Sequence, residues 1–268
     1  AIRVAGVDDD ISDGNSAFRI MLDNSSSTAA AEYVGLNPPD VMLSNLDDET
    51  PGFLISAISG NLVEKGGSAT FTVKMTSQPT SSVDIPLLVS DTSEATVAGD
   101  NATHLSFTTS NWNADHVVTL SAVDDSESDG TQSFYVNLGA DNSTLDTSGY
   151  RGLDPQDVAA ATQDDESAGF LVSSVSGSVT EEGGQALFTI RLTSQPTGSV
   201  ALSVSSDNTS EATVSPLTLT FTSTNWRSEQ AIRVTGVDDN ISDGNSAFRI
   251  VLDNSSSTAA AEYVGLNP

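Results

Sequence analysis

One stretch of the chain occurs twice: GFLISAISGNLVEKGGSATFTVKMTSQPT, residues 52–80, returns at residues 169–197 as GFLVSSVSGSVTEEGGQALFTIRLTSQPT. Within the first copy, Phe71, Val73 and Met75 alternate with polar side chains, and the second copy keeps this alternation. Strict alternation is the pattern of a β-strand with one buried face. The repeating unit is therefore expected to be built from strands.

The same alternation recurs further along each unit. Phe134, Val136 and Leu138 form one such run, and no segment of useful length carries a helical period. Turn-forming pairs separate the runs: Gly66-Gly67, Gln78-Pro79 and Asp129-Gly130. About seven short strands at this spacing predict an all-β fold of tandem seven-stranded, immunoglobulin-like Greek-key sandwiches joined end to end.

A longer match sets the domain organisation. Residues 1–38 return at 231–268 with three differences. A weaker copy begins at His116, about midway between them, so the repeating unit is about half as long as the distance between the two strong copies. We expect the C-terminal part of a preceding repeat at 1–49, a complete repeat at 50–166, and a second repeat that lacks its last strand at 167–268. The chain is then a segment of a longer protein.

The charge of the chain excludes several partners. It has 9 basic and 37 acidic residues, a net charge of −28, and no cysteine. Nucleic acids and anionic membranes require clustered Lys and Arg, so we expect neither partner, and no apolar run is long enough to insert into a membrane. Disulfides and cysteine-type zinc sites are excluded. The acidic side chains of such a chain repel one another unless cations bind to them.

The acidic residues cluster where predicted strands end. If the first strand covers residues 53–63, successive reversals bring the loops after the first, third, fifth and seventh strands to one end of the sandwich. In the complete repeat these loops carry Glu64, Asp91, Asp124, Asp125, Asp129, Asp164, Asp165 and Glu166. The preceding fragment supplies Asp8, Asp9, Asp13, Asp47, Asp48 and Glu49, and the second repeat supplies Glu181, Glu182, Asp207, Asp238, Asp239 and Asp243.

These oxygen donors predict a metal site. Carboxylates from several loops, without His or Cys, favour Ca²⁺, which accepts six to eight oxygens in a flexible shell. Mg²⁺ fits less well because it prefers a strict octahedron. Since Glu166 runs into the next repeat within a few residues, we expect several Ca²⁺ ions at each domain junction, which would become stiff. The alternative is a solvated acidic surface, and Asp129-Gly130 also fits a simple turn.

The residues resemble a known family. The Glu-x-Gly-Gly turn at Glu64, the Val-Asp-Asp at 123–125 and the terminal Asp-Asp-Glu at 164–166 look like the Calx-β and cadherin-like repeats of giant bacterial extracellular surface proteins. The resemblance covers essentially the whole chain and implies calcium ligands at Glu64, Asp91, Asp124, Asp125 and 164–166. One departure is that Asp207 stands one position before the equivalent of Asp91, which is Asn208.

Three function classes remain open. The leading hypothesis is a calcium-stiffened structural segment of a secreted or bacterial cell-surface protein, an adhesin stalk or extracellular fibre whose partners are its neighbouring repeats. The second is a subunit of a self-assembling filament or sheath, in which an identical chain donates the strand missing from the second repeat, expected at residues 40–46 of the first fragment. The third is a carbohydrate- or surface-binding adhesin module.

An enzyme is not expected. His104 and His116 are replaced by Thr218 and Ala231 in the next repeat, and the chain has no nucleophile elbow. The aromatic residues at equivalent loop positions could form a sugar-binding platform, but packing beneath a long loop explains them as well. They are Trp112 and Trp226 in one position and Tyr33, Tyr150 and Tyr263 in another.

Overall fold

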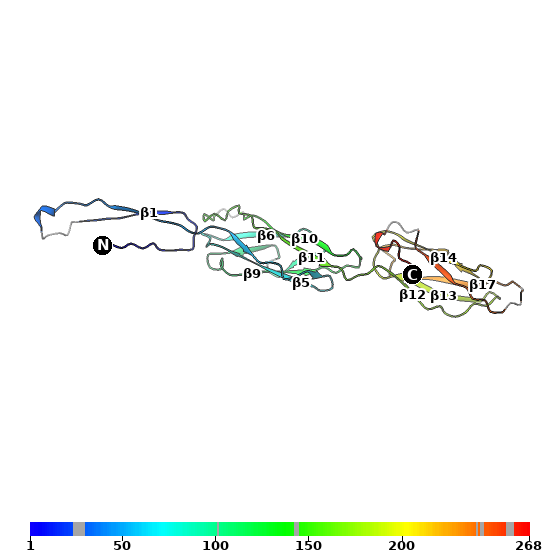
Figure 1. Ribbon diagram of the computed structural model, residues 1–268. Helices are drawn as coiled ribbons and strands as arrows, with labels where there is room; N and C mark the ends of the chain where they lie inside the picture. The colour runs from blue at the N-terminus through cyan, green and yellow to red at the C-terminus, as the bar shows by residue number, and fades with distance from the viewer. Residues whose placement is uncertain (24–29, 101, 142–144, 240, 242–243, 256–259) are drawn as a thin grey trace. The chain divides into compact units, whose positions relative to one another are not determined.

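The structure is a computed structural model that describes residues 1–268 except 24–29, 101, 142–144, 240, 242–243 and 256–259 (Figure 1). The all-β prediction is confirmed, since the described helices are single 3-10 turns at Ala31–Tyr33 and Ala261–Tyr263. The first strands are β1 Ser16–Ile20, β2 Val41–Asn45, β3 Phe53–Ile55, β4 Leu62–Val63, β5 Ser68–Met75, β6 Val83–Val89, β7 Ala95–Ala98, β8 His104–Phe107 and β9 His116–Ala122. They are followed by β10 Gln132–Leu138, β11 Val158–Gln163, β12 Phe170–Val172, β13 Gln185–Leu192, β14 Val200–Ser206, β15 Ala212–Ser215, β16 Thr218–Phe221, β17 Gln230–Gly236 and β18 Ile250–Asp253.

The complete repeat is a sandwich of two sheets. One sheet has the strand order β4-β11-β10-β6-β8, and the other has the order β3-β5-β9-β7. The predicted first strand over 53–63 is divided, because β3 pairs with β5 and β4 lies in the opposite sheet beside β11. The consecutive strands β7 and β8 likewise lie in different sheets, and Gly99, at a φ of 82°, directly follows β7.

The core of this sandwich follows the alternation in the sequence. Phe71, Val73 and Met75 on β5 are at most 2% exposed, and so are Phe134, Val136 and Leu138 on β10 of the other sheet. Burial of such side chains contributes about 1.5–3 kcal/mol each, so these alternating runs supply most of the driving force for the fold. The core also positions the strand ends that carry the acidic loops.

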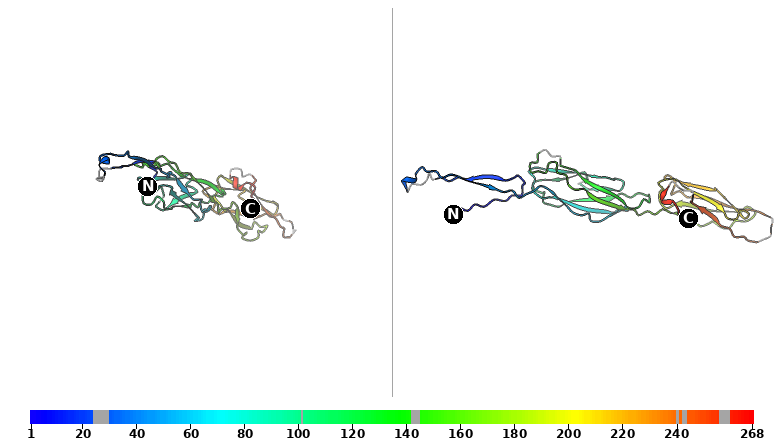
Figure 2. Two further views of the ribbon diagram at one scale, coloured as in Figure 1. Left: turned by 60° about the vertical axis from the view of Figure 1, so that its left-hand side comes forward. Right: turned by 45° about the horizontal axis from the view of Figure 1, so that its top comes forward.

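The second repeat has one full sheet and one shorter sheet. The full sheet is β12-β13-β17-β15, equivalent to β3-β5-β9-β7. The shorter sheet is β16-β14-β18, so β18 stands at its edge among the described residues, where the complete repeat continues into β11 and β4. The N-terminal segment adds a separate two-stranded sheet of β1 and β2, visible in both views of Figure 2.

Two loop tyrosines are buried in the sandwiches and hydrogen-bond to the backbone. Tyr150 and Tyr263 are fully buried, and the Tyr150 hydroxyl donates to the Ser77 carbonyl at 3.0 Å while accepting from the Ser77 backbone N–H at 2.9 Å. Tyr263 makes the equivalent bonds with Ser194. The packing explanation is therefore confirmed for these two residues. Tyr33, in the N-terminal segment, is 56% exposed.

We expect Tyr150→Phe to lower the free energy of unfolding of the complete repeat by about 1–3 kcal/mol, because it strands a buried backbone N–H. The chain has two tryptophans, so Trp112 fluorescence in a Trp226→Phe background reports urea unfolding of this repeat alone. Tyr135→Phe is the control, since the Tyr135 side chain is 53% exposed. Equal stability of the two variants would contradict the role given to the hydroxyl.

The chain divides into two compact units that do not coincide with the sequence repeats. The first comprises residues 1–62, 68–121 and 133–160, and the second comprises 63–67, 122–132 and 161–268. The acidic loops at 64, 124–129 and 164–166 all belong to the second unit. Among the described residues, no helix has the length and apolarity needed to cross a membrane.

Candidate metal centre

Strand pairing brings the acidic loops of the complete repeat together. Glu64 directly follows β4, and Asp164 directly follows β11, the neighbouring strand in the same sheet. The Glu64 backbone N–H donates to the Gln163 carbonyl at 3.1 Å, which fixes the register between the two loops. The Glu-x-Gly-Gly turn is sterically required, because a Cβ on Gly67 would lie 2.2 Å from the Val63 carbonyl oxygen.

Two groups of carboxylates share Glu64. One group is Glu64, Asp124 and Asp165, and the other is Glu64, Asp164 and Glu166; in each, one oxygen per residue lies within 4.8 Å of the others. Glu64 is 2% exposed, and Oε2 of Glu64 and Oε2 of Glu166 are buried without a hydrogen-bond partner. Buried carboxylate oxygens normally have partners, so this arrangement is one that a bound cation would complete.

The electrostatics of the cluster lead to the same conclusion. Burial, with the negative charges of Asp125, Asp164 and Glu166, raises the pKa of Glu64 to about 8. Burial and neighbouring carboxylates also raise the pKa of Glu166, and burial with the Asp125 charge raises that of Asp129. Without a cation, burial and the surrounding negative charge therefore oppose ionisation of these carboxyl groups, most strongly of Glu64.

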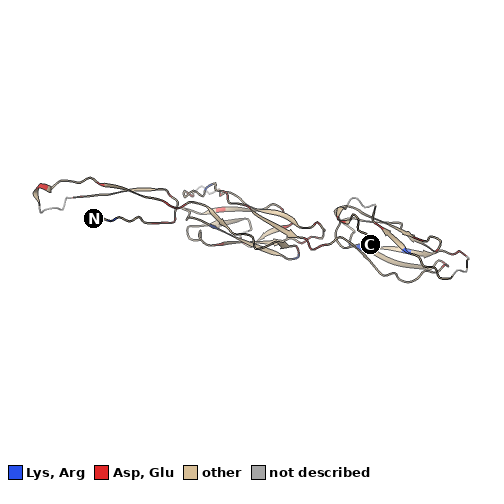
Figure 3. Cartoon of the chain, viewed as in Figure 1, with Lys and Arg blue, Asp and Glu red and all other residues tan. Residues whose placement is uncertain are grey.

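Backbone donors and one lysine compensate part of this charge. Asp164 accepts hydrogen bonds from the Gly130 N–H at 2.8 Å and the Glu166 N–H at 2.7 Å, which hold the loop closed. Asp125 accepts from the Glu127 N–H at 2.7 Å. Lys65 forms an exposed ion pair with Asp165 at 3.6 Å, and such pairs contribute little in water. The basic residues, coloured blue in Figure 3, are few along the chain.

The preceding fragment gathers a second cluster. Asp8, Asp48 and Glu49 each place an oxygen within 4.8 Å of the others. Asp47 instead accepts backbone hydrogen bonds from Gly14 and Glu49, and the Gly14 bond lowers the pKa of Asp47. The side-chain hydrogen bond that Glu49 donates to Asp47 raises the pKa of Glu49. Asp9 accepts from the Ile11 N–H, the same turn that Asp125 makes, and Asp13 lies exposed beside this loop.

The structure does not bring Asp91 or Asp207 into these groups. Asp91 accepts hydrogen bonds from the backbone N–H and hydroxyl of Ser93, which lower its pKa. Asn208, its equivalent, accepts the same two hydrogen bonds from Ser210, so a neutral amide can replace the carboxylate at this position. Asp207 accepts a hydrogen bond from the Arg249 backbone N–H at 2.7 Å. At the equivalent position of the complete repeat, the Ser90 hydroxyl accepts a hydrogen bond from the Tyr135 backbone N–H. Both residues therefore stabilise local backbone.

The predicted ligands of the second repeat remain dispersed in the described part of the chain. Glu181 and Glu182 are exposed, although Glu64, the equivalent of Glu181, is buried. Asp238 is exposed, and Asp239 accepts a hydrogen bond from the Ile241 N–H at 2.8 Å. Asp243 lies outside the described residues. No trio of acidic oxygens forms here among the residues described.

One further buried carboxylate is not among the predicted ligands. Glu94, in the loop after β6, is 6% exposed, and Glu211 occupies the same position in the second repeat. The motif Ser-Glu-Ala-Thr-Val recurs letter for letter around both residues. The repetition of this motif marks Glu94 in the sequence as strongly as the repeated Val-Asp-Asp motif marks Asp124.

Comparisons with known proteins identify the family of the chain. The model of the Calx-beta domain family matches residues 1–50, 47–167 and 163–268. Solved structures similar to the chain include the calcium binding domain CBD12 of CALX1.1 (16% identity, 72% of this chain and 76% of that chain, TM-score 0.31) and CBD12 of CALX1.2 (17%, 72% and 76%, TM-score 0.30). A type II cohesin dyad from the ScaA scaffoldin of Acetivibrio cellulolyticus matches at 9% identity, over 77% of this chain and 89% of that chain, with a TM-score of 0.27. No curated protein matches the chain.

The fold and the acidic strand ends thus define a class of protein: tandem immunoglobulin-like sandwiches with carboxylate-rich loops. The three family matches together span the chain, and the chain belongs to the Calx-beta domain family.

Proposed function

We propose that this chain is a calcium-stiffened structural segment of a long secreted or cell-surface protein, such as an adhesin stalk or an extracellular fibre. The observation that carries the proposal is Glu64, a buried carboxylate with a partnerless Oε2 facing Asp124, Asp164, Asp165 and Glu166. A dication would neutralise charges that otherwise repel one another at short range. The same logic assigns a site to Asp8, Asp48 and Glu49.

The donor chemistry favours Ca²⁺ over other ions. Every member of the two clusters is a carboxylate, and neither His nor Cys takes part. Oxygen-only donors on several loops suit the large, flexible shell of Ca²⁺. Extracellular calcium, at about millimolar concentration, would fill even weak sites of this kind, whereas cytosolic calcium would not.

Hydrogen bonds beside the clusters support the stiffening role. Within the second compact unit, the Gln195 backbone N–H donates to the Ser126 carbonyl at 2.6 Å, and the Gln195 side chain donates to Glu127 at 2.9 Å. Within the first unit, the Gln78 backbone N–H donates to the Asp10 carbonyl at 2.6 Å, which is the equivalent of the Gln195 backbone bond. Each bond ties the loop after a Val-Asp-Asp sequence to a Gln-Pro turn of the following repeat. An ion that orders the loop would therefore also fix that turn.

Calcium titration of the chelator-treated chain by isothermal calorimetry tests the proposal. We expect Glu64→Gln to weaken binding at one class of site by about tenfold or more, because it removes a central charged ligand. Asp91→Asn should leave the affinity nearly unchanged, since Asn208 already serves at that position. Asp115→Asn controls for net charge at an exposed loop. No heat of binding, or equal affinities for all four proteins, would refute the site.

The alternative functions receive less support. A carbohydrate-binding platform needs exposed aromatic residues, but Tyr150 and Tyr263 are fully buried and Trp226 is 9% exposed, which leaves Tyr33 and the half-buried Trp112. The expectation that the chain is not an enzyme stays a prediction. Filament assembly likewise stays a prediction.

A further inference from the structure

The chain enters the complete repeat at one end of the sandwich and leaves it at the other. It enters through β3, where Phe53 pairs with Met75 at one end of β5. The opposite end of β5 pairs with Ser121, three residues before Asp124. The chain leaves after β11, in a loop whose carboxylates gather with Asp124. Tension on the flanking residues therefore acts along the strands.

This tension falls on the contact between β4 and β11. The two strands are neighbours in one sheet, and both end at the carboxylates, so they run parallel. The first strand is pulled toward one end and the last toward the other, so β4 and β11 are driven to slide past each other. Hydrogen bonds that lie across the strands are then strained together. Because β4 comprises only Leu62 and Val63, its own ladder is short.

The carboxylates continue the contact beyond that short ladder. The Glu64 backbone N–H donates to the Gln163 carbonyl at 3.1 Å. Directly after this bond, Glu64 on one strand end gathers with Asp164 and Glu166 on the other, with one oxygen of each within 4.8 Å of the others. Glu64 is 2% exposed, and Oε2 of Glu64 and Oε2 of Glu166 are buried without a hydrogen-bond partner. A cation held by these oxygens would join the end of β4 to the end of β11.

We propose that Glu64, Asp164 and Glu166 form a force-bearing latch, in which bound Ca²⁺ resists the sliding of β4 past β11 when the repeat is pulled from its two ends. The proposal rests on the calcium function proposed above and gives it a direction. Forced unfolding is governed by the rate of unfolding. Links that break before the strands separate slow that step by their whole contribution. The latch therefore protects the repeat most against tension along the chain.

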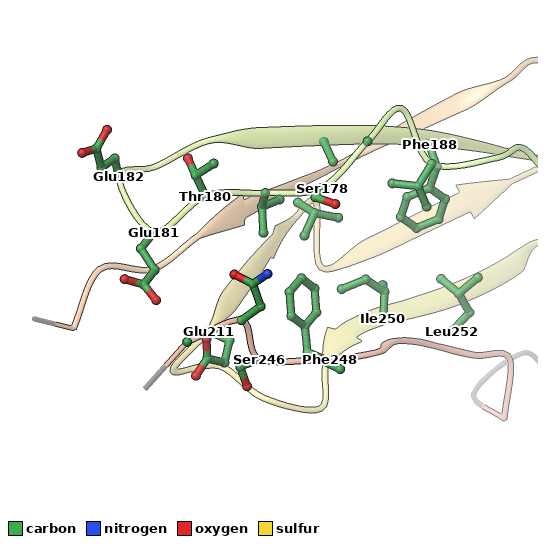
Figure 4. Close-up of a pocket in the computed structure, with 18 of the residues that line it drawn as sticks. Ser178, Thr180, Glu181, Glu182, Phe188, Glu211, Ser246, Phe248, Ile250 and Leu252 are labelled. Carbon is green, nitrogen blue, oxygen red and sulfur yellow. The ribbon is translucent and has the colours of Figure 1, made fainter. Parts of the chain in front are cut away.

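The equivalent turn of the second repeat supplies a matched control. Figure 4 shows Glu181, the equivalent of Glu64, and Glu182 on this turn, and both are exposed. In the part of the chain that the structure describes, no acidic trio includes Glu181. Glu181→Gln therefore removes the same charge from the same turn motif as Glu64→Gln does, without touching the latch.

Optical tweezers test the latch, because a chain without cysteine accepts DNA handles at chosen positions. Thr50→Cys and Ser167→Cys, both at exposed residues, load the complete repeat from its two ends. At constant force, unfolding should be about tenfold to a hundredfold slower in calcium, at about a hundredfold excess over its dissociation constant, than in chelator. Glu64→Gln should remove most of this difference, and Glu181→Gln should keep it. Equal behaviour of these two variants would overturn the proposal.

A second pulling direction separates the latch from general stabilisation. Handles at Thr92→Cys and Ser110→Cys, also exposed, load β7 and β8 instead of β4 and β11. In this direction calcium should change the unfolding rate at most about threefold. Equal slowing in both directions would refute the latch.

Calorimetry on the same chains distinguishes the two levels of the argument. Calcium binding without slower unfolding between residues 50 and 167 refutes the latch and leaves the calcium function intact. Absence of calcium binding refutes the calcium function, and the latch falls with it.

Discussion

Removing calcium should lower the melting temperature of the complete repeat by about 10 °C or more near pH 8. A ligand present at a hundredfold excess over its dissociation constant stabilises the folded state by about 2.7 kcal/mol, and each kcal/mol shifts the melting temperature of a small domain by about 4–8 °C. The repeat at 50–166 is slightly larger than those domains, which reduces the shift per kcal/mol. The ion also relieves repulsion around Glu64, where the carboxylates gather.

The effect of chelation should depend on pH with a definite sign. The pKa of Glu64 rises from 4.5 in the unfolded chain to about 8 in the folded protein without metal. Between these values the folded protein retains a proton that the unfolded chain releases, so the metal-free protein loses stability as pH rises from about 4.5 through 8. Calcium requires the ionised carboxylate, so protons compete with it at low pH. Chelator should therefore matter little near pH 5.

Thermal unfolding followed by Trp112 fluorescence in the Trp226→Phe background measures this prediction. The melting temperature is recorded with calcium and with chelator at about pH 5, 6.5 and 8. Glu64→Gln is expected to be less sensitive to pH in chelator and less responsive to calcium, because the titrating group is gone. Asp115→Asn should behave as the natural sequence does. A melting temperature that calcium leaves unchanged at every pH would refute the metal centre.

The sequence predicted the sandwich well because burial on one face imposes strict alternation. Phe71 and Phe134 show this, since both lie in alternating runs and both face the core. The division of the first strand into β3 and β4 was not predictable, because residues 56–61 carry no signal that says which sheet each half joins. Switching sheets depends on the shape of the finished sandwich.

The candidate site was predicted in part. Strand counting correctly indicated that Glu64 would lie near Asp124 and Asp164, since these loops follow strands that end together. It could not separate a ligand from a turn-capping residue, because Asp91 satisfies the same sequence pattern while its oxygen bonds to Ser93. Which carboxylate is buried depends on the strand that covers it. Sequence equivalence therefore did not distinguish buried Glu64 from exposed Glu181.

Truncating equivalent phenylalanines should have very different effects on stability. Phe134→Ala is expected to lower the free energy of unfolding of the complete repeat by about 3–5 kcal/mol, because Phe134 is 2% exposed beneath a closed edge. Phe248→Ala should cost clearly less, since Phe248 is only half-buried. Truncation of a half-buried side chain removes less buried apolar surface than truncation of a fully buried one.

Urea unfolding measures both costs, with Trp112 as the reporter for Phe134 and Trp226, in a Trp112→Phe background, for Phe248. β11 lies beside β10 in the complete repeat, which is why Phe134 is buried there. Equal costs of the two truncations would contradict the link between the burial of each phenyl ring and its contribution to stability.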